Sequence, residues 1–526
     1  MEEMQEIKNQ EIRSFLDEIK KIRQEEEQDK DAPKIKASLT ISRLAFFYEK
    51  ARNSLEYKDE HLIIKSAIER ILRRKFFAYN PDQPLAKGIL FELISGGYIA
   101  NDSVPETKIE KITRILDRYY YLFSNLVKRP NRRIIASIVA CAIEESLNRG
   151  VKEKEVLVNF TYQTIRGKLL LDKFVDEHTV DMQLYIAIHR TLLKSDYQTI
   201  RYRLLKNIIP NLEDFDTNIH DILLKFEDAN NLIDYLFKDK LKNNFLKFCR
   251  KSVPPFSVLG KIIVETPIEK IEESLNNELE FKRITETAYN RWRDRAYSKI
   301  GRSAIRSVIF IFFTKMILAF VLEVPYDLIV NQEIIWIPLL LNLMFPPFYM
   351  FINTFNISVP GRENLEAIKA SLKKVAFDEG SYNYQMKVKK SGSVGKITFF
   401  FIYLLTFVIS FVGLTYVLLL LHFNIVAITL FFIFFSTINF FVYRISRVAN
   451  ELLVVKSSGG IREAFADFFS VPFIKLGQFF SSNFSKINIF LFILDVIIET
   501  PFKAIIQFLE DWVSYAKEKK EDILDE

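Results

Sequence analysis

The sequence is poor in the residues that build disulfide or metal-bound scaffolds. Of 526 residues only two are cysteines, Cys141 and Cys249, and five are histidines. No CxxC pair, HExxH pattern or other ligand spacing occurs, which argues against a disulfide framework, a zinc ribbon and a zinc hydrolase. We therefore predict no metal and no cofactor, and a reducing compartment for the soluble part of the chain.

Catalytic motifs are also lacking. Neither G-x-S-x-G nor a kinase-like set of motifs is present. The stretch 391–396 (SGSVGK) resembles a phosphate loop, but it lacks the upstream glycine and the Ser or Thr after Lys396. We interpret this stretch as a flexible basic loop and predict that the protein is not an enzyme.

A strong excess of one charge is missing as well. Lys and Arg number 73 against 66 Asp and Glu, a net charge of +7. Basic patches at 73–75 and 128–133, the second preceded by tyrosines at 119–121, could contact nucleic acid. Cations also collect at helix C-termini, so nucleic acid is not an expected partner. The charged start of the sequence predicts no signal peptide and a cytoplasmic location for the first 300 residues.

Long apolar runs are the dominant positive feature. Residues 397–421 and 425–443 contain no Asp, Glu, Lys or Arg. A helix needs ~20 apolar residues to cross a bilayer, where the backbone must satisfy its own hydrogen bonds. Two further runs, at 305–322 and 334–352, give four predicted transmembrane helices.

Basic residues mark every second loop between these runs, which predicts both termini in the cytoplasm. The Lys-, Ile-, Phe- and Asn-rich composition with little cysteine favours a plasma membrane, specifically a bacterial inner membrane. A basic collar abuts the first run and should attract anionic headgroups, by ~1 kcal/mol per cation. Its members are Arg291, Arg293, Arg295, Lys299, Arg302 and Arg306.

The rest of the sequence has helical periodicity, so the predicted class is all-α: a polytopic membrane protein with a large cytoplasmic helical domain. Predicted helices include 84–96, 106–128, 133–149, 154–175, 180–195, 197–207 and 228–250. The predicted domains are a charged N-terminal helix or tail (1–33), a cytoplasmic domain (34–300), the span domain (301–450) and a C-terminal amphipathic, membrane-surface segment with a charged tail (451–526).

The two ends of the chain leave alternatives open. Ile12, Phe15, Ile19 and Ile22 have the 3-4-3 spacing of a coiled-coil seam, but over two heptads only, and we favour a solvated helix or frayed tail. The 12-residue apolar run at 487–498 is too short to span a bilayer. The segment 464–498 is therefore predicted to be interfacial or re-entrant.

Polar residues within or beside the apolar runs are the candidate site. An intramembrane charge is costly and is treated as functional by default. Lys315 could instead snorkel outward or pair structurally with an acid such as Asp495. The candidates are Lys315, Asn342, Asn439, Asp495 and Glu499.

The leading functional hypothesis is a non-enzymatic scaffold or adaptor that binds a protein partner, or a second copy of itself, through its helical domain. The alternative is a transporter or channel component that uses Lys315 and Asn342. A lipid-modifying enzyme is a weaker third hypothesis, since it requires a polar cluster near Asp467, Asp495 and Glu499.

Overall fold

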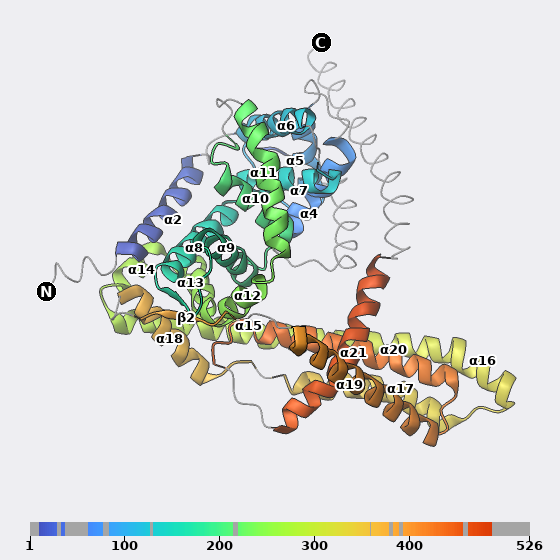
Figure 1. Ribbon diagram of the computed structural model, residues 1–526. Coiled ribbons are helices and arrows are strands. Elements are labelled where there is room, and N and C mark those ends of the chain that lie inside the picture. The colour runs from blue at the N-terminus through green and yellow to red at the C-terminus, as the bar shows by residue number, and fades with distance from the viewer. Residues whose placement is uncertain are drawn as a thin grey trace, which may run out of the picture. The chain divides into compact units, whose positions relative to one another are not determined.

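The computed structural model describes residues 10–28, 33–36, 62–76, 84–126, 130–213, 219–357, 359–377, 382–388, 393–455 and 461–486. These residues are almost entirely helical, which confirms the all-α class (Figure 1). The sequence did not predict one small parallel pair of strands, β1 (Leu169–Leu171) with β2 (Tyr384–Met386). The chain divides into two compact units. Among the described residues, we call those within 1–253 and 382–387 the N-terminal unit, and those within 254–381 and 388–486 the span unit.

The N-terminal unit is built around α7, in which every residue from Ile135 to Glu144 is buried. A helix that is apolar on all sides must be covered on all sides, and α4, α6, α8 and α10 cover it. The helices of this unit are α2 (Gln10–Gln28), α4 (Ile63–Lys75), α5 (Leu85–Ser95), α6 (Thr107–Asn125), α7 (Arg132–Leu147), α8 (Arg149–Arg166), α9 (Glu177–Leu192), α10 (Tyr197–Ile208), α11 (Ile219–Lys238) and α12 (Lys242–Ser252).

Side-chain caps fix where several of these helices begin. Asn131, Asn148, Asp176 and Asp196 each accept a backbone N–H from the first turn of the helix that follows. Such caps satisfy donors that have no partner within the helix. The helix predicted at 228–250 is wrong in one respect, because it is divided into α11 and α12. Asp239 accepts the Leu241 N–H (2.7 Å) at this break.

The prediction of a solvated helix or frayed tail is wrong for α2. Ile12, Phe15 and Ile19 are buried, and the helix packs against α8 of the same chain. The Phe15 and Phe160 rings stack with their centroids 4.5 Å apart. The apolar seam seen in the sequence is therefore used within the chain and is not exposed as a coiled-coil surface.

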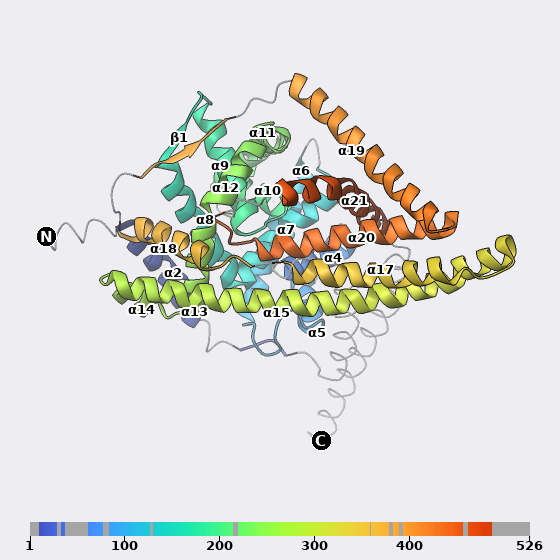
Figure 2. The same ribbon diagram turned by 90° about the horizontal axis from the view of Figure 1, so that it is seen from below.

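The span unit contains four helices that are long and apolar enough to cross a membrane: 278–330, 336–355, 400–420 and 425–447. This confirms the predicted number by length and composition. Its elements are α13 (Pro254–Glu265), α14 (Ile268–Ser274), α15 (Glu278–Leu318), η3 (Ala319–Glu323), α16 (Val324–Tyr326), η4 (Asp327–Asn331), α17 (Trp336–Phe355), α18 (Arg362–Phe377), α19 (Ser393–Leu420), α20 (Ile425–Ala449) and α21 (Ile461–Lys486). Figure 2 shows α15, α17 and α20 running side by side, in accord with their mutual contacts.

The predicted end of the first span is wrong. Residues 323–331 were expected in a loop, but the helix that begins as α15 continues without a break to Asn331, through two π-helical turns, η3 and η4. Pro325 lies between these turns and has no N–H for the carbonyl four residues earlier, and a change to i→i+5 bonding is one way for a helix to continue past it. The domain boundary predicted after residue 300 also falls inside α15.

Only part of the predicted C-terminal segment lies within the described residues. Residues 461–486 form one helix, α21, with Pro472 inside it. It packs closely on α20, where Gly477 lies so near the Ser436 carbonyl that a Cβ would overlap it. The apolar run at 487–498, with Asp495 and Glu499, lies outside the described residues.

Candidate functional site

The inward face of the first span helix carries charge. Ile311, Lys315, Ala319, Glu323 and Asp327 follow one another at intervals of four, and each is at most 4% exposed. In a helix this spacing places side chains on one face. The face packs against α17 and α20. An acid and a base are thus enclosed between three of the apolar helices.

Lys315, Glu323 and Asn342 meet at the centre of this cluster. The Lys315 Nζ atom lies 3.1 Å from Glu323 Oε1 and 5.0 Å from the centre of the Phe434 ring. The Asn342 amide donates to the same carboxylate oxygen (2.6 Å) and to the Ala427 carbonyl (3.2 Å). One oxygen of Glu323 therefore accepts from both a cation and an amide.

Acceptors remain unused beside this carboxylate. The Oδ1 atom of Asn342 is buried and has no hydrogen-bond partner. Pro346 lies inside α17 and has no N–H to give to the main-chain carbonyl of Asn342. A buried acceptor without a partner costs about 1–3 kcal/mol, so position 342 combines two features that packing alone would disfavour.

A second buried acid links the cluster to the end of α20. Asn424 caps that helix by accepting the Ala427 N–H (2.7 Å), and its amide donates to Asp327 (2.7 Å). The positive end of the α20 dipole stabilises a nearby anion. Polar groups thus run from Lys315 through Glu323 and Asn342 to the start of α20, where the short turn 421–424 joins α19 to α20.

The structure brings together some predicted site residues and separates others. Lys315 and Asn342 share the cluster, but Asn439 instead accepts from the Tyr349 hydroxyl (3.1 Å) at another contact of α17 with α20. Asp495 and Glu499 lie outside the described residues. Glu323 and Asp327 were not predicted as site residues, because both lie in a stretch that was predicted to be a loop. Their spacing of eight and twelve residues from Lys315 would have shown the shared face had the helix been extended.

The basic collar lies entirely within α15. Arg291, Arg295, Lys299, Arg302 and Arg306 are exposed and recur at intervals of four, four, three and four residues, so they form one stripe. Arg291 and Arg295 also lie 3.5 and 2.7 Å from Glu265 of α13. Arg293 lies off the stripe, next to Asp294 (3.4 Å).

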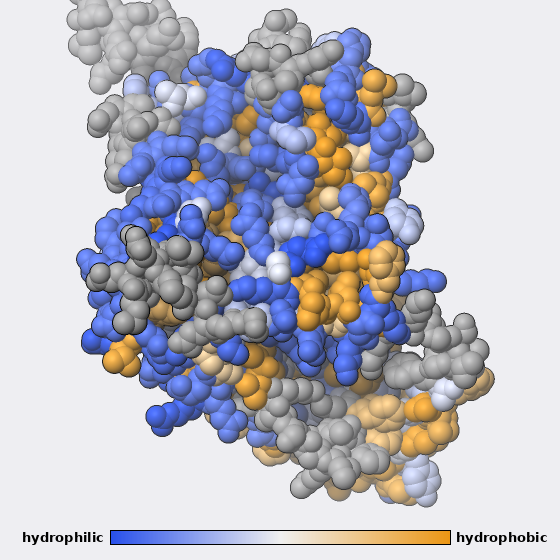
Figure 3. Space-filling view, turned by 60° about the vertical axis from the view of Figure 1, so that its left-hand side comes forward, coloured by the Kyte–Doolittle hydropathy of each residue, from blue (hydrophilic) through white to orange (hydrophobic). Residues whose placement is uncertain are grey.

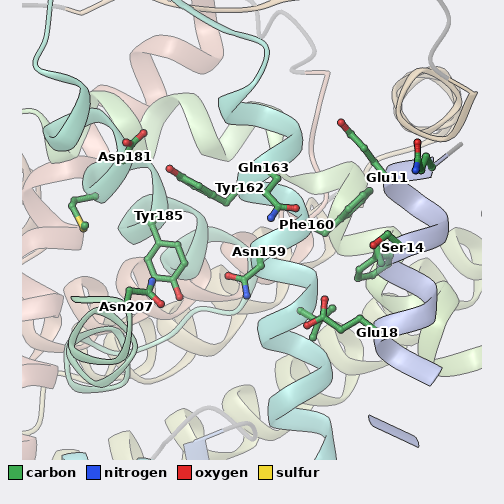
Figure 4. Close-up of a pocket in the computed structure, with 14 residues that line it drawn as sticks. Glu11, Ser14, Glu18, Asn159, Phe160, Tyr162, Gln163, Asp181, Tyr185 and Asn207 are labelled. Carbon is green, nitrogen blue, oxygen red and sulfur yellow. The ribbon is translucent and has the colours of Figure 1, made fainter. Parts of the chain in front are cut away.

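The N-terminal unit carries a groove with a volume of about 830 Å³. Figure 4 shows α2 on one side, α8 in the middle, and α9 with α10 on the other side. None of the described residues that line it is Lys or Arg. Amide, hydroxyl, carboxylate and aromatic groups alternate along its walls: Glu11, Ser14, Glu18, Phe15, Asn159, Phe160, Tyr162, Gln163, Asp181, Tyr185 and Asn207.

An ionic network supports the floor of the groove. The Tyr185 hydroxyl donates to Glu155 (2.5 Å), and Arg203 lies 3.0 Å from both Glu155 and Glu145. His189 lies 3.4 Å from Glu155. Burial acts to raise the pKa of Glu155, but His189, Arg203 and Tyr185 outweigh it and lower the pKa to about 2. The groove therefore has a rigid, charged support.

A second groove, of about 640 Å³, lies between α6, α7, α8 and α10. Its charges are largely matched within the unit, since Arg114 pairs with Glu110 and Lys206 with Glu145 and Glu213. Such matched pairs near a surface contribute little and select no particular ligand.

No group that could act as a metal site or reactive thiol occurs among the described residues. No three His, Cys, Asp or Glu side chains are placed to hold a metal ion there. Cys141 is buried, and burial raises its pKa to about 12, so its thiol is a poor nucleophile. No family model, curated protein or solved structure matches this chain.

Proposed function

We propose that the protein is a multi-pass membrane protein that acts as a non-enzymatic scaffold, with the N-terminal unit docking a protein partner. The groove between α2, α8 and α9 carries this proposal. Its volume of about 830 Å³ and its mixture of aromatic and hydrogen-bonding side chains suit an inserted peptide segment. The matched charges of the second groove offer no comparable surface.

Membrane insertion of the span unit completes the proposal. Ile305, Ile309, Phe313 and Ile317 are each at least 52% exposed and lie at intervals of four. Figure 3 shows how apolar residues cover the surface of the span helices, whereas hydrophilic residues predominate elsewhere on the face in view. An exposed apolar stripe opposite the buried Lys315 face is the arrangement expected of a helix that faces lipid.

The orientation proposed from the loop charges puts both termini in the cytoplasm of a plasma membrane. The exposed stripe from Arg291 to Arg306 would then lie at the cytoplasmic headgroups, where anionic lipids attract it. Neutralising its three residues nearest the apolar run, Lys299, Arg302 and Arg306, should invert part of the population. Accessibility of single cysteines placed in the turn 421–424 would measure this.

Site-specific photocrosslinking tests the docking proposal. A photoreactive amino acid at Gln163, exposed in the groove, should give one discrete adduct in native membranes. The same amino acid at Leu224, which is 76% exposed on α11, is the matched control. Ser14→Trp narrows the groove from the α2 side and should abolish the Gln163 adduct. Equal labelling at both positions, or an adduct unaffected by Ser14→Trp, would contradict docking in the groove.

A further inference from the structure

We propose that Lys315, Glu323 and Asn342 form a proton-binding site inside the span unit. The inference does not depend on the docking groove. An ionisable acid and base in direct contact are both enclosed, with Lys315 0% and Glu323 1% exposed. Buried ion pairs of this kind are poor contributors to stability, because desolvation offsets much of their attraction. A purely structural contact at this position could be made more cheaply by apolar side chains.

The π-helical turns place the acids of this site. Glu323 is the last residue of η3, and Asp327 is the first residue of η4. π-Helical turns inside longer helices occur frequently at functional sites. Here they keep both carboxyl groups on the face that already carries Lys315.

The resident ammonium group selects a proton over a metal cation. A sodium ion bound to Glu323 would lie close to the positive Lys315 Nζ, which is only 3.1 Å from the same carboxylate. Like charges at such a separation repel strongly in a low-dielectric interior. A proton avoids this repulsion, since it can move from Lys315 Nζ to Glu323 Oε1 and convert ammonium and carboxylate into amine and carboxylic acid.

The unused acceptor of Asn342 can accept a hydrogen bond from the protonated form of Glu323. A protonated Glu323 becomes a hydrogen-bond donor, and Asn342 Oδ1 is a buried acceptor without a partner. Rotation of the carboxyl group, or a flip of the amide, would pair the two. The proton then gained from water by the remaining base leaves the cluster with one additional positive charge.

Exchange with water should occur at the turn 421–424. Asp327 and Asn424 connect the cluster to this turn (2.7 Å), and His422 is exposed on it. Among the described residues, α17 brings only Tyr349 as a titratable side chain. On α20, Tyr443, Arg444 and Arg447 lie toward the opposite end of the helix. Neither α17 nor α20 brings an acid to the cluster, and Asp327, four residues after Glu323, is the second acid of the site.

Infrared difference spectroscopy on the full-length protein in liposomes tests the site. Acidification should produce the carboxylic-acid band of a group shielded from water, at a frequency separate from that of exposed carboxyl groups, and ¹³C-glutamate labelling should shift this band without any change of sequence. Glu323→Gln should abolish the band. Asp327→Asn should leave the band but slow its appearance after a pH jump. Asn439→Leu, which removes the Tyr349 contact between α17 and α20, is the control. It should change neither the band nor the rate at which the band appears.

Each outcome decides the proposal. A band that shifts with labelling and disappears in Glu323→Gln supports proton binding. Absence of the band in the wild type, or its persistence in Glu323→Gln, overturns it and leaves a structural ion pair. A band that sodium ions suppress at constant pH overturns it in favour of a metal-cation site.

Discussion

The two units bury charge in different ways. In the N-terminal unit Glu155 contacts Arg203, Tyr185 and His189, so the loss of any one contact leaves Glu155 with two other partners. In the span unit Lys315 has one described acid partner, Glu323, and the amide that completes the cluster keeps an unused acceptor. A charged group with several partners keeps one protonation state and one position. A single ion pair between apolar helices has fewer contacts that hold its protonation state, so we expect that state to change more easily.

Removal of Lys315 should give the largest effect. Lys315→Leu leaves Glu323 buried without its cation, and we expect the free energy of unfolding to fall by about 3–5 kcal/mol. Lys315→Leu/Glu323→Leu should recover most of this loss, because no unpaired charge remains. Thermal unfolding in detergent measures both. Ile317→Leu, on the exposed face of the same helix, is the control, and a single variant as stable as the wild type would contradict the enclosed pair.

Acid should weaken the N-terminal unit through Glu155. Its folded pKa of about 2 lies below the usual 4.5, so its contribution is complete above about pH 4.5 and is lost as pH falls towards 2. The lowered pKa of Glu155 contributes roughly 3 kcal/mol to the free energy of unfolding at neutral pH. Amide exchange in α8 and α9 should show this loss. Glu155→Gln should reduce protection at neutral pH and flatten the acid dependence, whereas Glu18→Gln in the groove wall should leave it unchanged.

Glu144 should show the opposite dependence. Burial raises its pKa to about 7 from 4.5, so the folded state keeps a proton that the unfolded chain releases. Stability then falls as pH rises from about 4.5 to 7, and Glu144→Gln should restore roughly 3 kcal/mol at about pH 8 and nothing at about pH 4. The neighbouring Glu145→Gln, which loses Arg203 and Lys206 as partners, should destabilise instead. Exchange of the α7 amides distinguishes the two variants.

Steric contact in the span unit gives the smallest expected change. Gly477→Ala places a Cβ against the Ser436 carbonyl and Phe440, and overpacking of this kind costs about 1–3 kcal/mol. Gly413→Ala, on α19, meets no atom within 4 Å and should be stabilising by about 0.5–1 kcal/mol through helix propensity. Equal melting temperatures for the two variants would contradict close packing of α20 on α21.

Local patterns in the sequence predicted the helical class and the number of apolar helices. Runs such as 397–421 are apolar whatever surrounds them, and the required length follows from the thickness of a bilayer. Breakers and caps such as Asn131 also act within a few residues, so several helix boundaries in the N-terminal unit were predicted within a few positions.

The candidate site could be predicted only in part. Lys315 and Asn342 were recognised because a charge and an amide stand out in apolar runs, but Glu323 was assigned to a loop, since the apolar run ends at Leu322. The continuation of the helix through two π-turns, and the contacts of Lys315 with Glu323 and of Glu323 with Asn342, follow from packing between helices. Those partners depend on how α17 and α20 pack against α15, and no local pattern of residues specifies that packing.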